Sequence, residues 1–427
     1  MNPNQYNQRD TVLVIAPYPA RSTTHTGGGI ASYTKNTLLA IKKANPTQKI
    51  VVLANIIDEP ETYLENDILV VRCWDRNPGL YLQLLRQINK YSQAKKVLFE
   101  FEFAAYGDFL TTSLIPLLLT YLRLTGKSIT TVLHQVVADL QQLGLHVGLS
   151  HKPKSLNIFN RGLHLFYQII ALLSNQVITL EEPLAKKLQA ITGRTNIVTI
   201  PHGLYPKKAL GRCQALTLLN LNSKNLYVLA FGYLSHYKGS DLIVKAFKRP
   251  IKIGGRTVKL ILAGGESPTQ GQKNHYRGFY KRLYDAIDNN ENIIHTGFVP
   301  ETRIKSYFSA ADLVVFPYRT FMSASGPLSL AASYQKPFLA SQPLSIYNPD
   351  FVETSAEDFR RAVINSLKSK KRLENLRQNS KSLGVRRDFD IQGQIYLNLI
   401  SRSRSVKLDL WPKTSPNSDI APSFARS

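Results

Sequence analysis

Short apolar runs recur along this chain, separated by longer segments in which polar and apolar residues alternate with helical spacing. Runs rich in Val, Ile and Leu that are bounded by helical segments are typical of parallel strands buried on both faces of a sheet. In the first half, the pattern predicts strands at residues 12–16, 49–55, 68–72, 96–101, 128–134, 176–180 and 196–200. In the second half, it predicts strands at residues 226–231, 258–263, 292–296, 312–316 and 337–341.

The number of predicted strands indicates more than one domain. Twelve strands exceed a sheet of ordinary size, so we expect an α/β protein with two doubly wound parallel-sheet domains. The boundary is expected within residues 201–212, where Pro, Gly and Lys interrupt the pattern. The expected units are an N-terminal domain, a C-terminal domain, a final helix and a disordered tail, over residues 1–205, 206–388, 389–412 and 413–427.

The chain of 427 residues is strongly basic, with a formal net charge of +25. Nucleic acid, an anionic membrane surface or a phosphorylated substrate would each suit this charge. The sequence contains no zinc-finger, RNA-binding or basic-zipper motif, so we do not expect nucleic acid as the partner. The two cysteines, Cys73 and Cys213, are far apart, which argues against a disulfide framework or a four-cysteine zinc site and favours a reducing, cytoplasmic location.

Two apolar segments, residues 109–124 and 162–173, bear on membrane contact. Neither is long and unbroken enough to span a bilayer, and residues 1–10 are too polar for a secretory signal. We expect both segments to form buried helices at a domain interface. Together with the basic charge, they leave open a peripheral contact with an anionic membrane at its inner face.

In the first half, candidate functional residues follow the predicted strands. Parallel sheets bind ligands at the carboxyl ends of their strands, and a glycine-rich turn before a helix lets a ligand approach backbone N–H groups. The glycine-rich segment at residues 27–44 lacks the dinucleotide-binding fingerprint, so an ordinary turn remains the alternative. The side chains expected near a ligand are Glu100, Glu102, Tyr106, His134, Gln135 and His202. Instead of binding a ligand, the two glutamates could be structural hydrogen-bond acceptors. His202 could likewise have a purely conformational role in the segment between the domains.

In the second half, four glycine-bearing loops follow predicted strands. Lys238 and Gly239 stand at a helix start after Gly232, where a lysine and free N–H groups can bind a diphosphate. A second helix is expected to begin near Pro327. The other residues expected to frame a nucleotide are Gly264, Gly265, Gly297, Phe298, Ser325 and Gly326. One such loop is ordinary, but four at one sheet edge predict an anion site.

These motifs resemble those of the family 4 glycosyltransferases, retaining enzymes with the GT-B fold. The most specific block is residues 297–341, which contains GFVP, YFSAADLVVFPYR, SG and KPFLAS in the family's order. The resemblance extends from the GGG loop at residues 27–29 to a C-terminal helix near residues 389–400 that would return to the N-terminal domain. It implies two Rossmann-like domains that face each other across a cleft, with the acceptor on the N-terminal side and a nucleotide-diphosphate sugar on the C-terminal side.

The resemblance also implies roles for particular residues. Lys238 matches the lysine that neutralises the donor diphosphate, and His134 matches a histidine near the transferred sugar. Gly28 and Gly29 match the loop under the phosphates, and Gly326 matches the helix start that receives the distal phosphate.

Three positions depart from the family pattern. Tyr233 stands where an arginine is frequent, and Ser323 and Ala331 stand where two glutamates usually hold the sugar and the ribose. Losing these carboxylates affects sugar recognition more than phosphate binding, and Ser323, Ser325 or Gln135 could substitute. The sequence therefore predicts a retaining hexosyltransferase that needs no metal or other cofactor and acts on a glycan or lipid-linked acceptor. The alternative is a catalytically decayed protein that binds or scaffolds.

Overall fold

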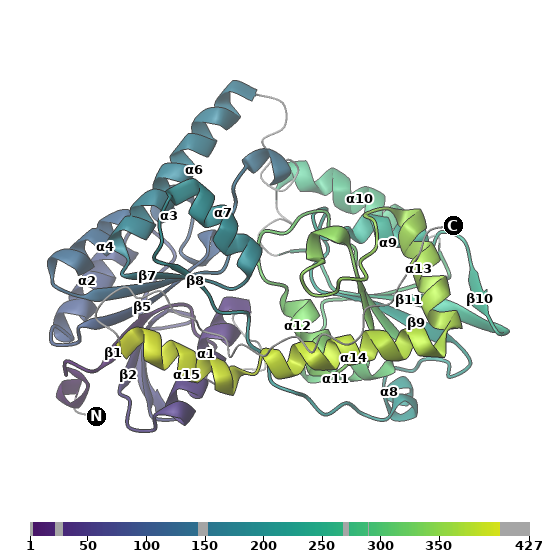
Figure 1. Ribbon diagram of the computed structural model, residues 1–427, viewed down its shortest axis with the longest axis horizontal. Helices are drawn as coiled ribbons and strands as arrows, with labels where there is room; N and C mark the ends of the chain where they lie inside the picture. Colours follow the sequence, from purple (N-terminus) through teal and green to yellow (C-terminus); the bar gives the residue numbers. More distant parts are fainter. Residues whose placement is uncertain (1–2, 22–28, 144–152, 268–272, 289, 402–427) are drawn as a thin grey trace, which may run out of the picture.

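The computed structural model describes residues 3–21, 29–143, 153–267, 273–288 and 290–401. Two α/β units lie side by side, each built on one sheet (Figure 1). The N-terminal sheet has eight strands in the order β3-β4-β2-β1-β5-β6-β7-β8. Its strands are β1 (Val12–Ile15), β2 (Ile50–Asn55), β3 (Glu61–Glu65), β4 (Ile68–Trp74), β5 (Lys96–Phe101), β6 (Ser128–Leu133), β7 (Gln176–Thr179) and β8 (Ile197–Thr199).

The C-terminal sheet has six strands, and β11 is paired on both sides. β9 pairs with Val258–Ala263 on one side of β11, whereas β10 and β12 share the other side. The complete order is β10-β11-β9-β13-β14, with β12 beside β11. The strands are β9 (Leu226–Phe231), β10 (Ile251–Ile253), β11 (Arg256–Ala263), β12 (Ile293–Gly297), β13 (Leu313–Phe316) and β14 (Phe338–Ala340).

Each of the twelve predicted strands is present, so the prediction of two parallel-sheet units is confirmed. The two strands that were not predicted, β3 and β10, are both antiparallel to their neighbours and lie at sheet edges. Central strands such as β1, β2 and β4 are buried throughout, which is why their continuous apolar runs were readable from the sequence.

Helices cover both sheets. Around the N-terminal sheet lie α1 (Gly29–Ala44), α2 (Leu80–Lys90), α3 (Phe109–Ser113), α4 (Ile115–Leu124), α6 (Pro153–Leu173), α7 (Glu182–Thr192) and α15 (Phe389–Ser401). Around the C-terminal sheet lie α8 (Arg212–Leu218), α9 (Ser240–Ala246), α10 (Asn274–Asp288), α11 (Glu301–Ala310), α12 (Gly326–Ser333), α13 (Ala356–Lys368) and α14 (Lys370–Arg386). Short 3₁₀ turns occur at Pro3–Tyr6, Phe103–Ala105, Leu140–Leu143 and Gln342–Leu344.

The last described helix, α15, packs on the N-terminal unit although α14 before it packs on the C-terminal unit (Figure 1). Gly393 lies so close to the Ala40 carbonyl of α1 that a Cβ at this position would overlap it. The Tyr33 and Tyr396 hydroxyls form a buried hydrogen bond of 2.8 Å across the same contact. The chain therefore crosses between the two units twice, once before α8 and once after α14.

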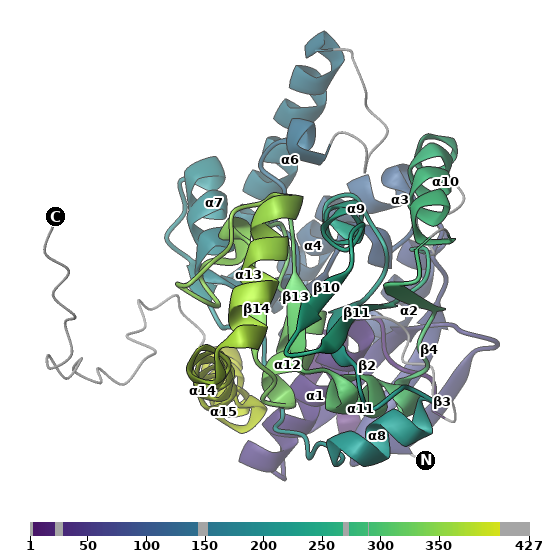
Figure 2. The same ribbon diagram turned by 90° about the vertical axis from the view of Figure 1, so that its right-hand side faces the viewer.

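The expectation for residues 109–124 and 162–173 was wrong in part. Both segments are helical, as α3–α4 and part of α6, but they mainly cover the outer face of the N-terminal sheet (Figures 1 and 2). At the start of the second segment, Leu163 packs toward Met322 of the C-terminal unit. Each buries only one side against the sheet and exposes large apolar side chains on the other. In the described residues, no helix is long and apolar enough to cross a membrane.

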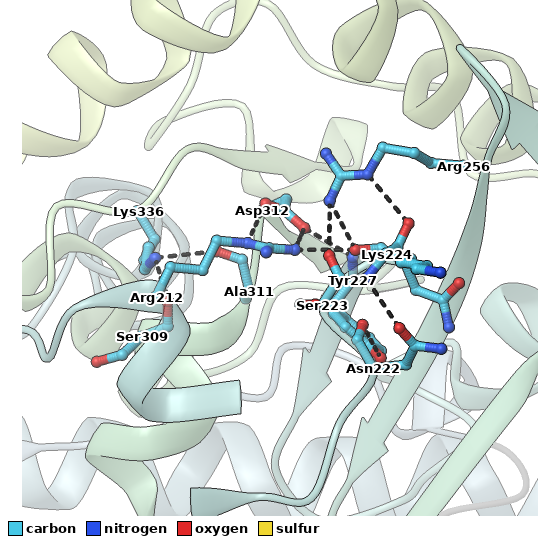
Figure 3. A network of polar contacts seen from close by, with 11 residues as sticks. Arg212, Asn222, Ser223, Lys224, Tyr227, Arg256, Ser309, Ala311, Asp312 and Lys336 are labelled. Atoms are coloured by element: carbon cyan, nitrogen blue, oxygen red, sulfur yellow. Dashed lines mark hydrogen bonds and ion pairs between the residues drawn. The ribbon is translucent and has the colours of Figure 1, made fainter. Parts of the chain in front are cut away.

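A polar network holds the amino ends of the C-terminal strands together (Figure 3). Asp312, just before β13, accepts two hydrogen bonds of 2.8 Å from the Arg212 guanidinium and one of 2.8 Å from the Tyr227 N–H of β9. Lys336 donates to the Ser309 and Ala311 carbonyls at the end of α11. The network lies at the edge of the sheet opposite to the strand ends that form the candidate site, and we assign it a structural role.

Candidate functional site

The carboxyl ends of the strands in the two sheets face one another, and the loops that follow them touch. Gln135, after β6, forms an antiparallel bridge with Ser323, after β13. The Val136 N–H donates to the Met322 carbonyl at 3.0 Å, and Lys187 Nζ of α7 donates to the Phe321 carbonyl at 2.8 Å. A cavity of about 630 Å³ opens beside these contacts, lined by α7 and by the loops after β9, β13 and β14.

Lys238 lies where these loops converge. A methyl group added at Gly232 would lie 3.6 Å from Lys238 Nζ and 2.9 Å from Pro327 Cγ, so the loop after β9 lies against the first turn of α12. Burial lowers the pKa of Lys238 to about 8, and the charge of Glu102 from the N-terminal unit acts in the opposite direction. A buried ammonium group in this position can bind an anion, because an anionic ligand would replace the solvation that burial removes.

The loop that contains Lys238 is fixed by the neighbouring loop. The Arg319 guanidinium donates to both carboxylate oxygens of Asp241 at 2.7 Å. The backbone N–H of Arg319 donates to the Tyr237 carbonyl at 2.7 Å. Gly239 has φ of +71°, and a Cβ there would overlap the Pro317 carbonyl, so this position requires glycine. Sequence reasoning missed Arg319 and Asp241, because only the folded loops bring these two residues together.

On the N-terminal side, a histidine–carboxylate pair lies at the ends of β5 and β6. His134 Nε2 lies 2.6 Å from Glu100 Oε2, and the Tyr33 ring packs edge-on against the imidazole at 5.0 Å. Glu100 is fully buried, and its Oε1 has no hydrogen-bond partner among the described residues. With Glu100 ionised, the proton of a neutral His134 is held on Nε2, which leaves Nδ1 as the ring nitrogen available to a ligand.

Glu102 and His202 have shifted pKa values. Burial raises the pKa of the Glu102 carboxyl, while the charges of His134 and Lys238 oppose the shift. The pKa of His202 is lowered to about 4, mainly by burial and in smaller part by the neighbouring charge of His134. His202 Nδ1 lies 2.8 Å from the Gly203 carbonyl, so a neutral His202 donates this proton to the backbone at the crossing between the two units.

Two exposed aromatic side chains lie beside the glycine loops of the C-terminal unit. Phe298, after β12, is 56% exposed, and Tyr233, after β9, is 39% exposed. Between them, Gly264 packs so closely on the Gly232 carbonyl that a Cβ at Gly264 would overlap it. Exposed rings beside a bare backbone form a surface on which a flat heterocycle can stack.

The start of α12 offers fewer free donors than the sequence suggested. Ser325 is buried, and its hydroxyl caps the helix by accepting from the Leu328 N–H at 3.2 Å. The same hydroxyl lies 3.0 Å from the Tyr318 hydroxyl. Pro327 has no N–H, and the N–H groups of Leu328 and Ser329 are already bonded to Ser325. The Gly326 N–H therefore remains as the donor of this turn that has no hydrogen-bond partner among the described residues.

The positions of the two missing glutamates differ in their surroundings. Ser323 is half-buried and lies at the bridge to Gln135, whose Nε2 approaches the Met322 sulfur at 3.2 Å. Ala331 is fully buried in the hydrophobic core beneath α12. A polar side chain at this second position would therefore enter the core rather than the cleft.

Two residues expected near a ligand, Glu100 and Tyr106, are fully buried away from the cleft, and Gly28 cannot be assessed. Tyr106 does not reach the cleft: it is fully buried, stacks on Trp74, and lies within hydrogen-bond distance of the Glu100 carbonyl at 2.6 Å. A tyrosine in that environment supports the core, so its expected acceptor role was wrong. Gly28 lies outside the described residues, and Gly29 is the first residue of α1.

A buried ion pair at the crossing was also missed from the sequence. Arg387, after α14, donates to both carboxylate oxygens of Glu181, which follows β7. The Tyr347 hydroxyl donates to the same carboxylate at 2.7 Å, and the guanidinium lies 4.7 Å from the Tyr347 ring centroid. Among the residues described, no group of three or more His, Cys, Asp or Glu side chains is arranged to hold a metal ion.

Residues 218–383 match the family model described as "Glycosyl transferases group 1". No curated protein gives a significant sequence match.

Solved structures match the chain over nearly its whole length. Sucrose-phosphate synthase from Thermosynechococcus elongatus is 16% identical, with 92% of this chain and 99% of that chain covered and a TM-score of 0.69. HepE from Anabaena, solved in complex with UDP and glucose, is 13% identical, with 92% and 100% covered and a TM-score of 0.64. WaaG, described as a glycosyltransferase involved in lipopolysaccharide biosynthesis, is 13% identical, with 91% and 99% covered and a TM-score of 0.62. These similarities identify the fold as GT-B.

Proposed function

We propose that the protein is a retaining glycosyltransferase of the family 4 type, which transfers a hexose from a nucleotide-diphosphate sugar to a hydroxyl acceptor. The observation that supports this proposal most directly is the position of Lys238, beside Gly232 and Pro327 and opposite Glu102 across the cleft. The match of residues 218–383 to the group 1 model covers these C-terminal loops. HepE was solved with UDP-glucose, which makes this donor the first one to test.

In the proposed mechanism, Lys238 and the Gly326 N–H bind the donor diphosphate and stabilise the negative charge that develops as the sugar leaves. Phe298 and Tyr233 provide surfaces for the nucleobase. The acceptor hydroxyl attacks from the side of the leaving group, so the anomeric configuration is retained. The leaving phosphate accepts the proton of that hydroxyl, and the step requires no metal ion and no separate base.

The N-terminal residues orient the sugar and the acceptor. His134 is held by Glu100 and offers Nδ1 to a sugar hydroxyl, and Glu102 can accept a hydrogen bond from a hydroxyl group. We propose that Ser323 and Gln135, paired at the bridge between the two units, make part of the sugar contact that a glutamate makes in the family. The acceptor would be a glycan or a lipid-linked glycan, and the enzyme would work in the cytoplasm, peripherally at the membrane.

A catalytically decayed binding protein is the second candidate. Two observations favour it, namely that Ala331 faces the core and that the Ser325 hydroxyl is used as a helix cap. Both candidates would bind UDP, so binding alone does not distinguish them. Only the first candidate would turn over a nucleotide sugar.

The test is to incubate purified protein with UDP-glucose and follow release or transfer of glucose by proton NMR. The enzyme proposal expects turnover that the Lys238→Met variant loses, and transferred sugar with the α configuration of the donor. UDP binding without any turnover across a panel of nucleotide sugars and hydroxyl acceptors would instead establish the decayed protein.

A further inference from the structure

The helices on the outer face of the N-terminal sheet expose two rows of large apolar side chains. Residues seven positions apart lie on the same side of one helix, as Leu117 and Leu124 do on α4 and as Ile158, Leu165 and Leu172 do on α6. One row, Leu117 and Leu124, lies on α4 and is preceded by Leu110 on the separate helix α3, and the other row, Ile158, Leu165 and Leu172, lies on α6. All six side chains are more than half exposed.

The two rows belong to one continuous surface, which we call the outer helical face and which comprises α2, α3, α4 and α6. The rings of Phe109 and Phe159 meet edge-on at 6.4 Å, and both side chains are exposed. On the other side, the Tyr121 hydroxyl of α4 donates to Asn89 of α2 at 2.5 Å, and α2 adds the exposed Leu82. Figures 1 and 2 show these helices on one face, with α6 extending beyond the rest of the unit.

The charge of the outer helical face has one sign. Residues 80–90, 109–124 and 153–173 contain no aspartate or glutamate. Among the side chains that the structure describes on these helices, the exposed basic ones are Arg86, Lys90, Arg123 and Arg161. The nearest acidic residue in sequence is Asp108, whose carboxylate caps α3 by accepting from the Thr111 N–H at 2.8 Å.

We propose that the outer helical face is a docking surface for an anionic lipid bilayer. Exposed Leu, Ile and Phe side chains can enter the boundary between headgroups and acyl chains, and basic side chains among them attract anionic headgroups. The face has long apolar rows and basic residues but no acidic residues, a combination that suits a bilayer. The donor cleft opens at the carboxyl ends of the strands rather than on this face, so docking leaves the cleft accessible.

Sedimentation with vesicles tests the proposal. The full chain is expected to pellet with vesicles made of equal parts phosphatidylglycerol and phosphatidylcholine, and not with phosphatidylcholine alone. The double variant Leu117→Gln with Leu165→Gln removes one apolar side chain from each row and should weaken vesicle partitioning at least about tenfold. The double variant Arg86→Gln with Arg161→Gln should weaken it about tenfold at low salt.

Matched controls separate this face from the rest of the surface. Val385→Gln with Ile391→Gln replaces two exposed apolar side chains on α14 and α15, and Lys248→Gln with Lys252→Gln removes two exposed charges from the C-terminal unit. Both controls should bind vesicles as the wild type does.

Three outcomes would overturn the proposal. In the first, the outer-face variants bind vesicles as tightly as the wild type. In the second, the control variants lose as much vesicle binding as the outer-face variants. In the third, the wild type is a dimer, and the Leu117→Gln and Leu165→Gln changes dissociate it without affecting vesicle binding. The last outcome, measured by analytical ultracentrifugation, would make this face an interface between two copies of the chain. Vesicle binding is measured without donor or acceptor, so its result does not depend on the proposed transfer reaction.

Discussion

Lys238 is the residue on which the donor site depends. Burial lowers its pKa to about 8, so near neutral pH most of the lysine is charged, and the charge is lost as the pH rises above that value. Glu102 is on the opposite side of the cleft, and its negative charge raises the pKa of Lys238 against the effect of burial. The two side chains therefore couple the two halves of the site electrostatically.

This coupling predicts the pH dependence of UDP binding. Since protonated Lys238 binds the diphosphate, affinity should be about twofold below its maximum near pH 8 and should then approach a fall of about tenfold per pH unit. In Glu102→Gln the supporting negative charge is absent, so the decline should begin at a lower pH. The measurement is isothermal calorimetry of UDP between pH 7.5 and 9.5. An unchanged onset in Glu102→Gln would show that the two groups do not interact.

Glu100 does not reach the cleft, but it holds His134, and we predict that it acts through this histidine as a positioning residue. Glu100→Gln keeps the shape of the side chain and removes its charge. It should lower kcat for sugar transfer about 10- to 100-fold while UDP affinity stays the same, because Lys238 is untouched.

A double-mutant cycle measures whether Glu100 acts through His134. Adding Glu100→Gln to a His134→Asn variant should cause little further loss, because the residue that Glu100 positions is already absent. If the two losses multiply instead, Glu100 has an independent role. Recovery of kcat in Glu100→Asp would support a positional role for the carboxylate.

The residues that converge at the cleft were largely predictable, since they follow strands whose carboxyl ends must share an edge. Lys238, Gly232, Pro327, His134 and Glu102 belong to this group. What could not be predicted is which way a side chain turns. Tyr106 follows a strand equally closely, yet its ring stacks on Trp74 in the core.

At the scale of elements, the strands with continuous apolar runs were predicted and the edge strands were not. β3 has the sequence ETYLE, with only its central residue buried, and β10 has three residues. Such strands lack a sustained apolar pattern because one neighbour and one face are missing. The helices α4 and α6 were placed wrongly for a related reason, since their apolar residues exceed what the sheet beneath them can cover.

The network around Asp312 should be important for stability and not for the site. We expect Asp312→Asn to lower the free energy of unfolding by about 2–3 kcal/mol, because it weakens two hydrogen bonds from Arg212 and one from a backbone N–H. Urea unfolding measures this change, and UDP affinity should stay at the wild-type value.

A matched control is Glu182→Gln, which removes a carboxylate from the exposed pair with Lys186. Exposed pairs at this spacing contribute about 0.5 kcal/mol or less. Equal losses in Asp312→Asn and Glu182→Gln would contradict the structural role assigned to the network.

For the whole molecule, the relation between the two units rests on contacts that no local pattern encodes. Glu181 and Arg387 are far apart in sequence and meet only because the chain crosses between the units twice. The Leu204 N–H donates to the Arg387 carbonyl at 2.8 Å, and the Phe389 N–H donates to the Leu204 carbonyl at 3.2 Å, so the two crossings run side by side. The resemblance to a known family implied a cleft between the units, but the contacts that set its geometry had to be seen in the structure.

The central claim is that this cleft binds a nucleoside diphosphate through Lys238, and calorimetric titration with UDP tests it most directly. We predict saturable binding to the wild type, about 100-fold weaker binding to Lys238→Met, and wild-type binding to Lys245→Met, which removes an exposed lysine from the same loop–helix region. If no nucleoside diphosphate binds, or if Lys238→Met binds UDP as tightly as the wild type, the account of the donor site is wrong.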